Sequence, residues 1–300
     1  MDLGVIGLGN IGGAIAANLV QDGNALRVFD LDRARRDGAA AAGAIACYDV
    51  RGVSAASEIT LLSLPTPDVV DAVAEEWSAA ASPGAVLVDL STNAPQRVRA
   101  LAERIRAGGR HFLDAPLSGG APGAQARMLM FMVGGEPEVF ERVRPVLATI
   151  GRAAFHLGPV GSGSVAKLVN SLVAFSTTMA SLEGLSLAVR GGLDLRQMVD
   201  VIRTGGAGNF YTERAVEGIE RRSAAPQFAL GLAAKDARLI LALENECGLP
   251  GRIASSLAAL LEDAIAAGMA ESDWTDLPAF FEREGGLRFM LAPAGGSAAA

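Results

Sequence analysis

A glycine-rich hexapeptide near the start of the chain places the strongest constraint on its fold. Residues 7–12 read GLGNIG, directly after the apolar run LGVI at 3–6 and at the start of an alanine-rich stretch of helical length. Glycines at this spacing permit a tight turn, let the backbone approach a pyrophosphate, and let a helix pack closely on a strand. The pattern predicts a dinucleotide-binding loop made of Gly7, Leu8, Gly9, Asn10, Ile11 and Gly12.

The rest of the first half alternates short β-rich runs with stretches of helical length, such as 11–21 and 95–107. Strand, helix and strand at this spacing predict right-handed crossovers and a mainly parallel, doubly wound sheet. A loop alone separates residues 111–115 from 129–133, so we expect the second of these runs to be an antiparallel or edge addition. The candidate strands are 3–6, 26–30, 58–64, 85–90, 111–115 and 129–133.

After Gly163 the β-rich runs give way to long stretches rich in Ala and Leu. Residues 164–189 are compatible with one long helix that Gly191 and Gly192 close, and Asp194 is a suitable N-cap for the next helix. We therefore expect this half to be all-helical. The further candidate helices are 211–221, 229–246, 251–267 and 275–283.

The chain length of 300 residues exceeds what one hydrophobic core usually serves, which favours two domains. The predicted fold class is an α/β Rossmann domain with a doubly wound, mainly parallel sheet, followed by an all-α C-terminal domain. We expect the first domain to cover residues 1–162 and the second to cover 163–290. The tail at 291–300 has little to bury, so we expect it to be disordered.

Charge and cysteine content exclude several classes of function. The formal net charge is -7 and the basic residues are scattered, so we expect neither nucleic acid nor a membrane surface as a partner. The longest uncharged stretch, 168–182, is too short to span a bilayer. Cys47 and Cys247 are far apart, and the two histidines are His111 and His156. We therefore expect no metal site, no disulfide and a cytoplasmic location.

Asp30 ends the strand that follows the glycine motif, eighteen residues after Gly12. A carboxylate there would accept hydrogen bonds from the adenosine ribose and repel a 2′-phosphate, which favours NAD over NADP. Arg33 and Arg35 leave NADP open, because either could meet a phosphate if Asp30 turned away. The alternative is that the glycines merely form a turn and that Asp30 merely ends a strand.

A second motif, DAPLSGG at 114–120, follows a candidate strand. Consecutive small residues expose backbone N–H groups, which together with the Ser118 hydroxyl can surround a carboxylate. The alternative interpretation is a tight structural loop.

A third motif, GPVGSGSVAKLVN at 158–170, leads from glycines into the long helix. Lys167 and Asn170 are three residues apart and so share a helix face. An amine near a bound nicotinamide could give a proton to a carbonyl oxygen as hydride reaches the carbon. The alternative is that Lys167 extends into solvent.

These motifs together resemble the β-hydroxyacid dehydrogenase family, which includes 3-hydroxyisobutyrate dehydrogenases and tartronate semialdehyde reductases. They occur in the family's order over nearly the whole chain. The matching stretches are 7–19, 62–65 (LSLP), 88–92 (VDLST), 114–120, 132–137 (MVGGEP), 158–170 and 228–242 (FALGLAAKDARLILA).

The resemblance implies roles for the substrate side of the site. Lys167 matches the family's catalytic lysine, an acid in reduction and a base in oxidation. Ser118, Gly119 and Gly120 match the loop that holds the substrate carboxylate. Asn170 matches the amide that orients the substrate.

The resemblance also implies roles for the cofactor side. Leu64, Pro65 and Thr92 match positions that line the nicotinamide. Lys235 matches a lysine that reaches in from the helical domain, and Asp236 after it is expected to be structural. The helical domains of the family associate, so we expect substrate binding and dimerisation in the second domain and a homodimer or homotetramer.

The chain departs from the family at two positions. Ser171 stands where many members have an amide, which removes one contact to substrate or water. Arg127 stands in ARML at 126–129, where members commonly read AGTL; it could contact an acidic substrate, but we expect it to point to solvent. Both departures concern the substrate more than the reaction.

The sequence therefore predicts an NAD(P)-dependent dehydrogenase or reductase of the EC 1.1.1 type that interconverts a small β-hydroxy acid and its semialdehyde. An imine reductase that reduces C=N with NADPH is one alternative, although such relatives usually replace the lysine. Phosphogluconate oxidation is disfavoured by the short helical part. A non-catalytic NAD(P)-binding interaction module is the alternative from another class.

Overall fold

The computed structural model describes residues 1–221 and 226–291. The chain consists of two compact units, Met1–Val169 and Asn170–Ala300, and the division falls inside helix α8 (Ser162–Arg190). The predicted boundary after residue 162 coincides with the start of that helix and stays a prediction. Residues 292–300 of the predicted disordered tail lie outside the described residues.

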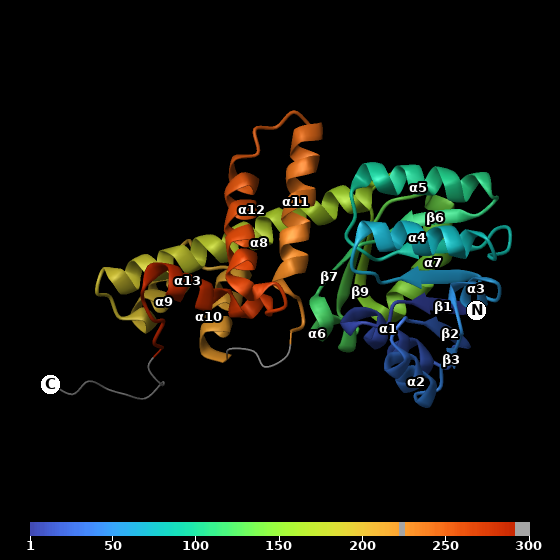
Figure 1. The fold of residues 1–300 in the computed structure, drawn as a ribbon, viewed down its shortest axis with the longest axis horizontal. Coiled ribbons are helices and arrows are strands. Elements are labelled where there is room, and N and C mark those ends of the chain that lie inside the picture. The colour runs from blue at the N-terminus through green and yellow to red at the C-terminus, as the bar shows by residue number, and fades with distance from the viewer. Residues whose placement is uncertain (222–225, 292–300) are drawn as a thin grey trace. The chain divides into compact units, whose positions relative to one another are not determined.

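A six-stranded parallel sheet forms the centre of the first unit (Figure 1), in the order β3-β2-β1-β4-β5-β6. Strand β1 pairs with both β2 and β4, so the strand order reverses there, as the predicted doubly wound fold requires. The two-residue strand β3 was not predicted. The strands are β1 (Leu3–Ile6), β2 (Leu26–Phe29), β3 (Ile45–Ala46), β4 (Ile59–Leu62), β5 (Val86–Asp89) and β6 (His111–Asp114).

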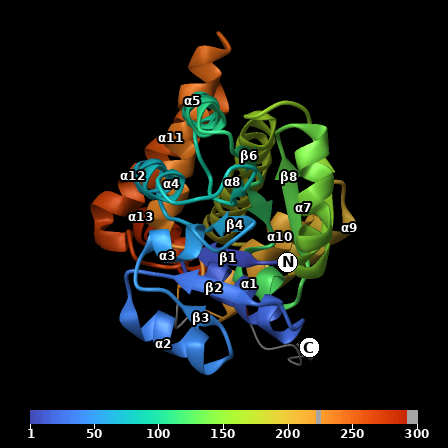
Figure 2. The ribbon, with the colours of Figure 1, turned by 90° about the vertical axis from the view of Figure 1, so that its right-hand side faces the viewer.

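The main sheet has an apolar core on each face, because successive side chains of a strand point to opposite faces. Val5 and Leu61 join the core beneath α1 and α7, whereas Ile6 and Leu62 join the core beneath α3, α4 and α5. Figure 2 shows these two sets of helices on opposite faces of the sheet. The helices are α1 (Asn10–Gln21), α2 (Arg33–Ala41), α3 (Val50–Ser54), α4 (Pro67–Ser78), α5 (Pro95–Ala107) and α7 (Pro137–Ile150).

A second, three-stranded sheet follows β6. It contains β7 (Leu117–Ser118), β8 (Leu129–Val133) and β9 (Gly151–His156), with helix α6 (Gly120–Gln125) between β7 and β8. The predicted strand at 129–133 is therefore not an edge strand of the main sheet. It lies at the centre of its own sheet, antiparallel to β7 and parallel to β9, and meets the end of β6 through an antiparallel bridge between Asp114 and Gly134.

The second unit is helical, as predicted. Asp194 caps α9, since its carboxylate accepts a hydrogen bond from the Gln197 amide at 2.9 Å. Phe175 and Trp274 pack with ring centroids 4.7 Å apart. Besides the rest of α8, the elements are α9 (Leu195–Thr204), α10 (Phe210–Arg221), α11 (Leu230–Glu246), α12 (Arg252–Ala264), the π-helical turn η1 (Ile265–Met269), the 3-10 turn η2 (Trp274–Asp276) and α13 (Leu277–Gly285).

Helix α8 is long and apolar enough to cross a membrane by length and mean hydropathy alone. The buried core helix of a soluble protein meets the same test, and Leu168, Leu182 and Leu185 of α8 are buried. The expected absence of a membrane partner stays a prediction.

Arg127 contacts its own chain, contrary to the expectation that it points to solvent. Its guanidinium donates to Asp22 Oδ2 at 2.7 Å, to the Thr149 carbonyl at 3.0 Å and to the Asn18 carbonyl at 3.1 Å. A cation suits this place, the C-terminal end of α1, where the helix dipole is negative. Arg127 adopts a positive φ of 58°, the conformation that glycine favours. These contacts of Arg127 all lie within the first unit.

Candidate functional site

The glycine loop between β1 and α1 is shaped as the sequence motif predicts. Gly7 has φ +90°, and a Cβ there would lie 2.3 Å from the Ser63 carbonyl oxygen. A Cβ on Gly12 would lie 1.9 Å from the Gly7 carbonyl oxygen, so the helix can approach the turn only without a side chain. Gly9, the N-cap of α1, has open space in front of it: the nearest atom to its Cβ position would be Arg35 Nη1 at 3.9 Å. This cradle at a helix N-terminus fits a pyrophosphate.

The Asp30 side chain lies against this loop, at the carboxyl end of β2. Its Oδ2 accepts a hydrogen bond from the Leu8 amide at 2.6 Å, and Arg35 Nη1 lies 3.5 Å from the same oxygen. Arg33 instead faces Asp37 at 3.4 Å. In this structure the carboxylate points toward the dinucleotide loop, with one arginine beside it.

The loops after β4 and β5 carry the residues expected beside the nicotinamide. Leu64 and Thr92 are half-buried and Pro65 is exposed. The Leu64 amide donates to Ser91 Oγ at 3.0 Å, which ties one loop to the other. Because β1, β4 and β5 are parallel neighbours, these loops lie at the same edge of the sheet as the glycine loop. Ser91 was not singled out from the sequence.

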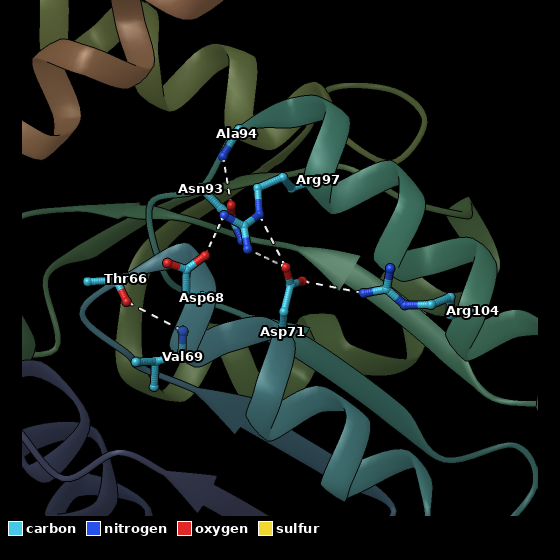
Figure 3. Close-up of polar contacts among 8 residues, drawn as sticks. All are labelled: Thr66, Asp68, Val69, Asp71, Asn93, Ala94, Arg97 and Arg104. Atoms are coloured by element: carbon cyan, nitrogen blue, oxygen red, sulfur yellow. Dashed lines mark hydrogen bonds and ion pairs between the residues drawn. The ribbon is translucent and has the colours of Figure 1, made fainter.

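An ion-pair network joins the helices that follow these two loops (Figure 3). Arg97 of α5 contacts Asp71 Oδ2 of α4 at 2.5 Å and Asp68 Oδ1 at 2.7 Å. Thr66 caps α4 with its hydroxyl, and Asn93 Oδ1 accepts a hydrogen bond from the amide at the start of α5 at 2.8 Å. Exposed pairs of this kind contribute little free energy individually. Their effect here is to hold the first turns of the two helices together.

Two buried carboxylates lie in register at the ends of β5 and β6, Asp89 and Asp114. Burial raises the pKa of each to about 6. Asp89 Oδ1 accepts from the Ser91 amide at 2.9 Å. The nearby Asn93 amide group lowers the Asp89 pKa, which opposes the effect of burial. Within the described residues, Asp89 Oδ2 and Asn93 Nδ2 make no well-formed hydrogen bond.

The DAPLSGG loop turns sharply after β7. Ser118 is half-buried at the end of β7, where it pairs with Met130 of β8. Gly119 and Gly120 have φ of +128° and +61° and are exposed at the start of α6. A residue with a Cβ rarely adopts the φ of Gly119, so the turn requires glycine there, whereas the φ of Gly120 favours glycine. Their backbone amides and the Ser118 hydroxyl are the groups expected to hold a carboxylate.

Asp114, the first residue of this motif, holds the segment that leads to Lys167. Its Oδ1 accepts from the Gly161 amide at 2.8 Å, and its Oδ2 accepts from the Ser164 amide at 2.7 Å and the Ser164 hydroxyl at 3.0 Å. Lys167, which is half-buried, follows Ser164 by three residues on α8. The second and third motifs therefore meet at one buried carboxylate. Sequence reasoning missed this contact, although a lone acid at the end of a buried strand was a usable signal.

Asn170 and Lys235 belong to the second unit. Asn170 is half-buried on α8, three residues after Lys167. Lys235 Nζ lies 2.8 Å from Asp236 Oδ1, and Asp236 is buried. The structural role expected of Asp236 and the cofactor role expected of Lys235 both stay predictions.

Known proteins match the chain over nearly its whole length. The family model described as the NAD binding domain of 6-phosphogluconate dehydrogenase matches residues 2–158. The model described as NAD-binding of NADP-dependent 3-hydroxyisobutyrate dehydrogenase matches residues 161–280. The 2-(hydroxymethyl)glutarate dehydrogenase of Eubacterium barkeri is 34% identical over 290 residues, which are 95% of this chain and 96% of that protein.

Solved structures show the same fold. The 3-hydroxyisobutyrate dehydrogenase of Mycobacterium tuberculosis, solved with L-serine, has a TM-score of 0.84 and 30% identity over 93% of this chain and 98% of that one. A variant imine reductase of Myxococcus stipitatus in complex with NAD+ has a TM-score of 0.65 and 23% identity over 93% and 98% of the two chains. The second likeness concerns the fold alone.

Because the pKa of Asp89 is raised, the free energy of unfolding should depend on pH. The native state binds the Asp89 proton more tightly than the unfolded state, so this group lowers the free energy of unfolding as pH rises from about 4 to about 6. Asp89→Asn removes this titrating group, so we expect the free energy of unfolding to fall by up to about 3 kcal/mol less over this pH range. Urea unfolding at a series of pH values measures it, with buried Trp77 as the sole fluorescent tryptophan in a Trp274→Phe background.

The control for this measurement is Asp37→Asn, because Asp37 is exposed and should leave the pH dependence unchanged. Identical slopes for wild type and Asp89→Asn would contradict the raised pKa.

Proposed function

Because the chain belongs to the β-hydroxyacid dehydrogenase family, we propose that it interconverts a small β-hydroxy acid and its semialdehyde. The chain is an NAD(P)-dependent oxidoreductase of the EC 1.1.1 type, which acts on CH–OH groups. The proposal for the substrate rests on one observation. The unit that contains the Gly7–Gly12 loop also contains both the Ser118 loop and the start of α8, tied to each other by Asp114.

The cofactor side of the proposal uses the edge of the main sheet. The cradle at Gly9 would take the pyrophosphate, and Asp30 would accept hydrogen bonds from the adenosine ribose. Leu64, Pro65 and Thr92 would line the nicotinamide. The bound nicotinamide supplies the hydride acceptor in oxidation and the hydride donor in reduction.

The substrate side uses the second and third motifs. The Ser118 hydroxyl and the amides of Gly119 and Gly120 would hold the substrate carboxylate, and Asn170 would orient the hydroxyl. In oxidation the Lys167 amine takes the hydroxyl proton as the hydride leaves the carbinol carbon. In reduction the Lys167 ammonium returns that proton to the carbonyl oxygen, so the charges balance in both directions.

A substrate screen tests the proposal. Purified protein is incubated with NAD or NADP and a panel of β-hydroxy acids that includes 3-hydroxyisobutyrate, L-serine and 2-(hydroxymethyl)glutarate. The semialdehydes are tested in reduction and cyclic imines in the same assay. Turnover of a hydroxy acid or its semialdehyde supports the proposal, whereas reduction of imines alone would assign the chain to imine reduction. Cofactor binding without any turnover would indicate a non-catalytic binding module.

We further infer a homodimer or homotetramer formed through the helical unit. Apolar side chains are exposed there, including Val173 at 56% and Leu187 at 74% on α8, and such surfaces commonly mark interfaces. Sedimentation velocity at micromolar concentration checks this inference, and a monomer would contradict it. A cytoplasmic location and the absence of a bound metal stay predictions.

Replacement of Lys167 tests its role as the acid and base. Lys167→Ala should lower kcat by about 10²–10⁴-fold and leave the Kd for NAD nearly unchanged. Stopped-flow turnover and titration of cofactor binding measure the two quantities. Arg144→Ala is the control, because Arg144 is exposed on α7 and has no expected role at the site. Near-normal turnover of Lys167→Ala would remove Lys167 from the mechanism.

Replacement of Asp30 tests the preference for NAD. Asp30→Ala removes the charge that repels a 2′-phosphate and releases Arg35 to meet it. The ratio of kcat/KM for NAD to that for NADP should fall at least about tenfold, equivalent to about 1.4 kcal/mol. The double variant Asp30→Ala/Arg35→Ala should lose the gain with NADP. An unchanged ratio in Asp30→Ala would show that Asp30 is not the selector.

A further inference from the structure

Asp114 is a buried carboxylate to which the proposed mechanism gives no role. It is 1% exposed and lies at the carboxyl end of β6. Its two oxygens accept three hydrogen bonds from Gly161 and Ser164, at 2.7–3.0 Å. All three donors precede Lys167 in the segment that forms the first turn of α8 and the loop before it.

The backbone around Asp114 is built to admit this carboxylate. A Cβ on Gly134 would lie 2.4 Å from Asp114 Oδ1, and a Cβ on Gly163 would lie 2.2 Å from the Met132 carbonyl oxygen and 2.6 Å from the Asp114 carbonyl oxygen. The Gly134 amide donates to the Asp114 carbonyl at 2.8 Å, and the Asp114 amide donates to the Gly134 carbonyl at 3.1 Å. The end of β6, the residue after β8 and the start of α8 therefore form one close-packed junction.

We propose that Asp114 positions Lys167 for proton transfer by fixing the first turn of α8 against the end of β6. The inference rests on the proposed function, because it assigns Lys167 the proton. Asp114 is a positioning residue and acts through the helix. Ser164 lies one helical turn before Lys167, so an error in the first turn displaces the amine directly.

The carboxylate form is required by the hydrogen bonds themselves. Both Asp114 oxygens face N–H or O–H donors, so an asparagine would turn an NH2 group toward at least one of those donors. The negative charge also suits the N-terminal end of a long helix. Asp114 is also the first residue of the DAPLSGG motif, four residues before Ser118.

The kinetic test compares Asp114→Asn, which removes the charge, with Ser164→Ala, which removes one hydrogen bond. Asp114→Asn should lower kcat by about 10²-fold, because misplacement of a reacting group by about 1 Å has that effect. The KM for substrate and the Kd for NAD should change by less than about threefold, since Asp114 is buried and both of its oxygens bind Gly161 and Ser164. Ser164→Ala loses one of the three hydrogen bonds and keeps the charge, so its kcat should fall less. A parallel loss of cofactor affinity and kcat would indicate a merely structural role and overturn the proposal.

A second readout does not depend on turnover. The two lysines of the chain allow competitive labelling with an amine reagent, in which Lys235 is the internal standard for Lys167. Asp114→Asn should raise the ratio of Lys167 to Lys235 labelling at least about threefold, because the first turn of α8 opens more often. Asp89→Asn is the matched control: it removes an equally buried acid in register on the next strand and should leave the ratio unchanged.

The two readouts separate the two hypotheses. Wild-type protein that turns over no hydroxy acid or semialdehyde would overturn the proposed function, and the labelling ratio would still decide whether Asp114 positions Lys167. An active wild type with unchanged kcat and an unchanged labelling ratio in Asp114→Asn would overturn the positioning role alone.

Discussion

The hydrogen bonds of the buried Asp114 join the main sheet, the second sheet and the start of α8. Transfer of a carboxylate out of water is costly unless hydrogen bonds replace the lost solvation. Three hydrogen bonds from Gly161 and Ser164 offset that cost in part, while burial raises the Asp114 pKa to about 6. The glycines at 134 and 163 are consequences of the same contact, because any side chain there would collide with the junction.

Much of the fold could be predicted because its signals are local. The strands at 3–6 and 129–133 have the predicted bounds, since each is a strongly apolar run that ends at a glycine. The helix at 95–107 has them too, since it begins at Pro95 and ends before Gly108. Strand β9 (Gly151–His156) was missed: it is partly exposed and contains no β-branched residue, so pairing with β8 alone makes it a strand. The placement of 129–133 in a separate sheet likewise depends on partners that no local pattern reveals.

In the candidate site, too, the features with a local sequence signal were predicted and those that depend on distant partners were missed. The glycine loop was predicted in detail because backbone geometry alone demands Gly7 and Gly12. Ser91 and Asp114 were not assigned contacts, because their partners lie 27 and 47–50 residues away in the chain. Arg127 was misjudged for the same reason: its partners at the C-terminal end of α1, Asn18 and Asp22, lie more than a hundred residues away. Side chains that act through distant backbone groups leave little trace in a single sequence.

The hydrogen bonds of Asp30 and Ser91 also affect the thermodynamics of binding. Each accepts a hydrogen bond from the backbone of a neighbouring loop, Leu8 in one case and Leu64 in the other. Each hydrogen bond restricts its loop when the chain folds. A ligand that binds at this edge then has less ordering to impose, so more of the contact energy remains as affinity. Weakening one of these hydrogen bonds would lower affinity through entropy, even where the altered residue never touches the ligand.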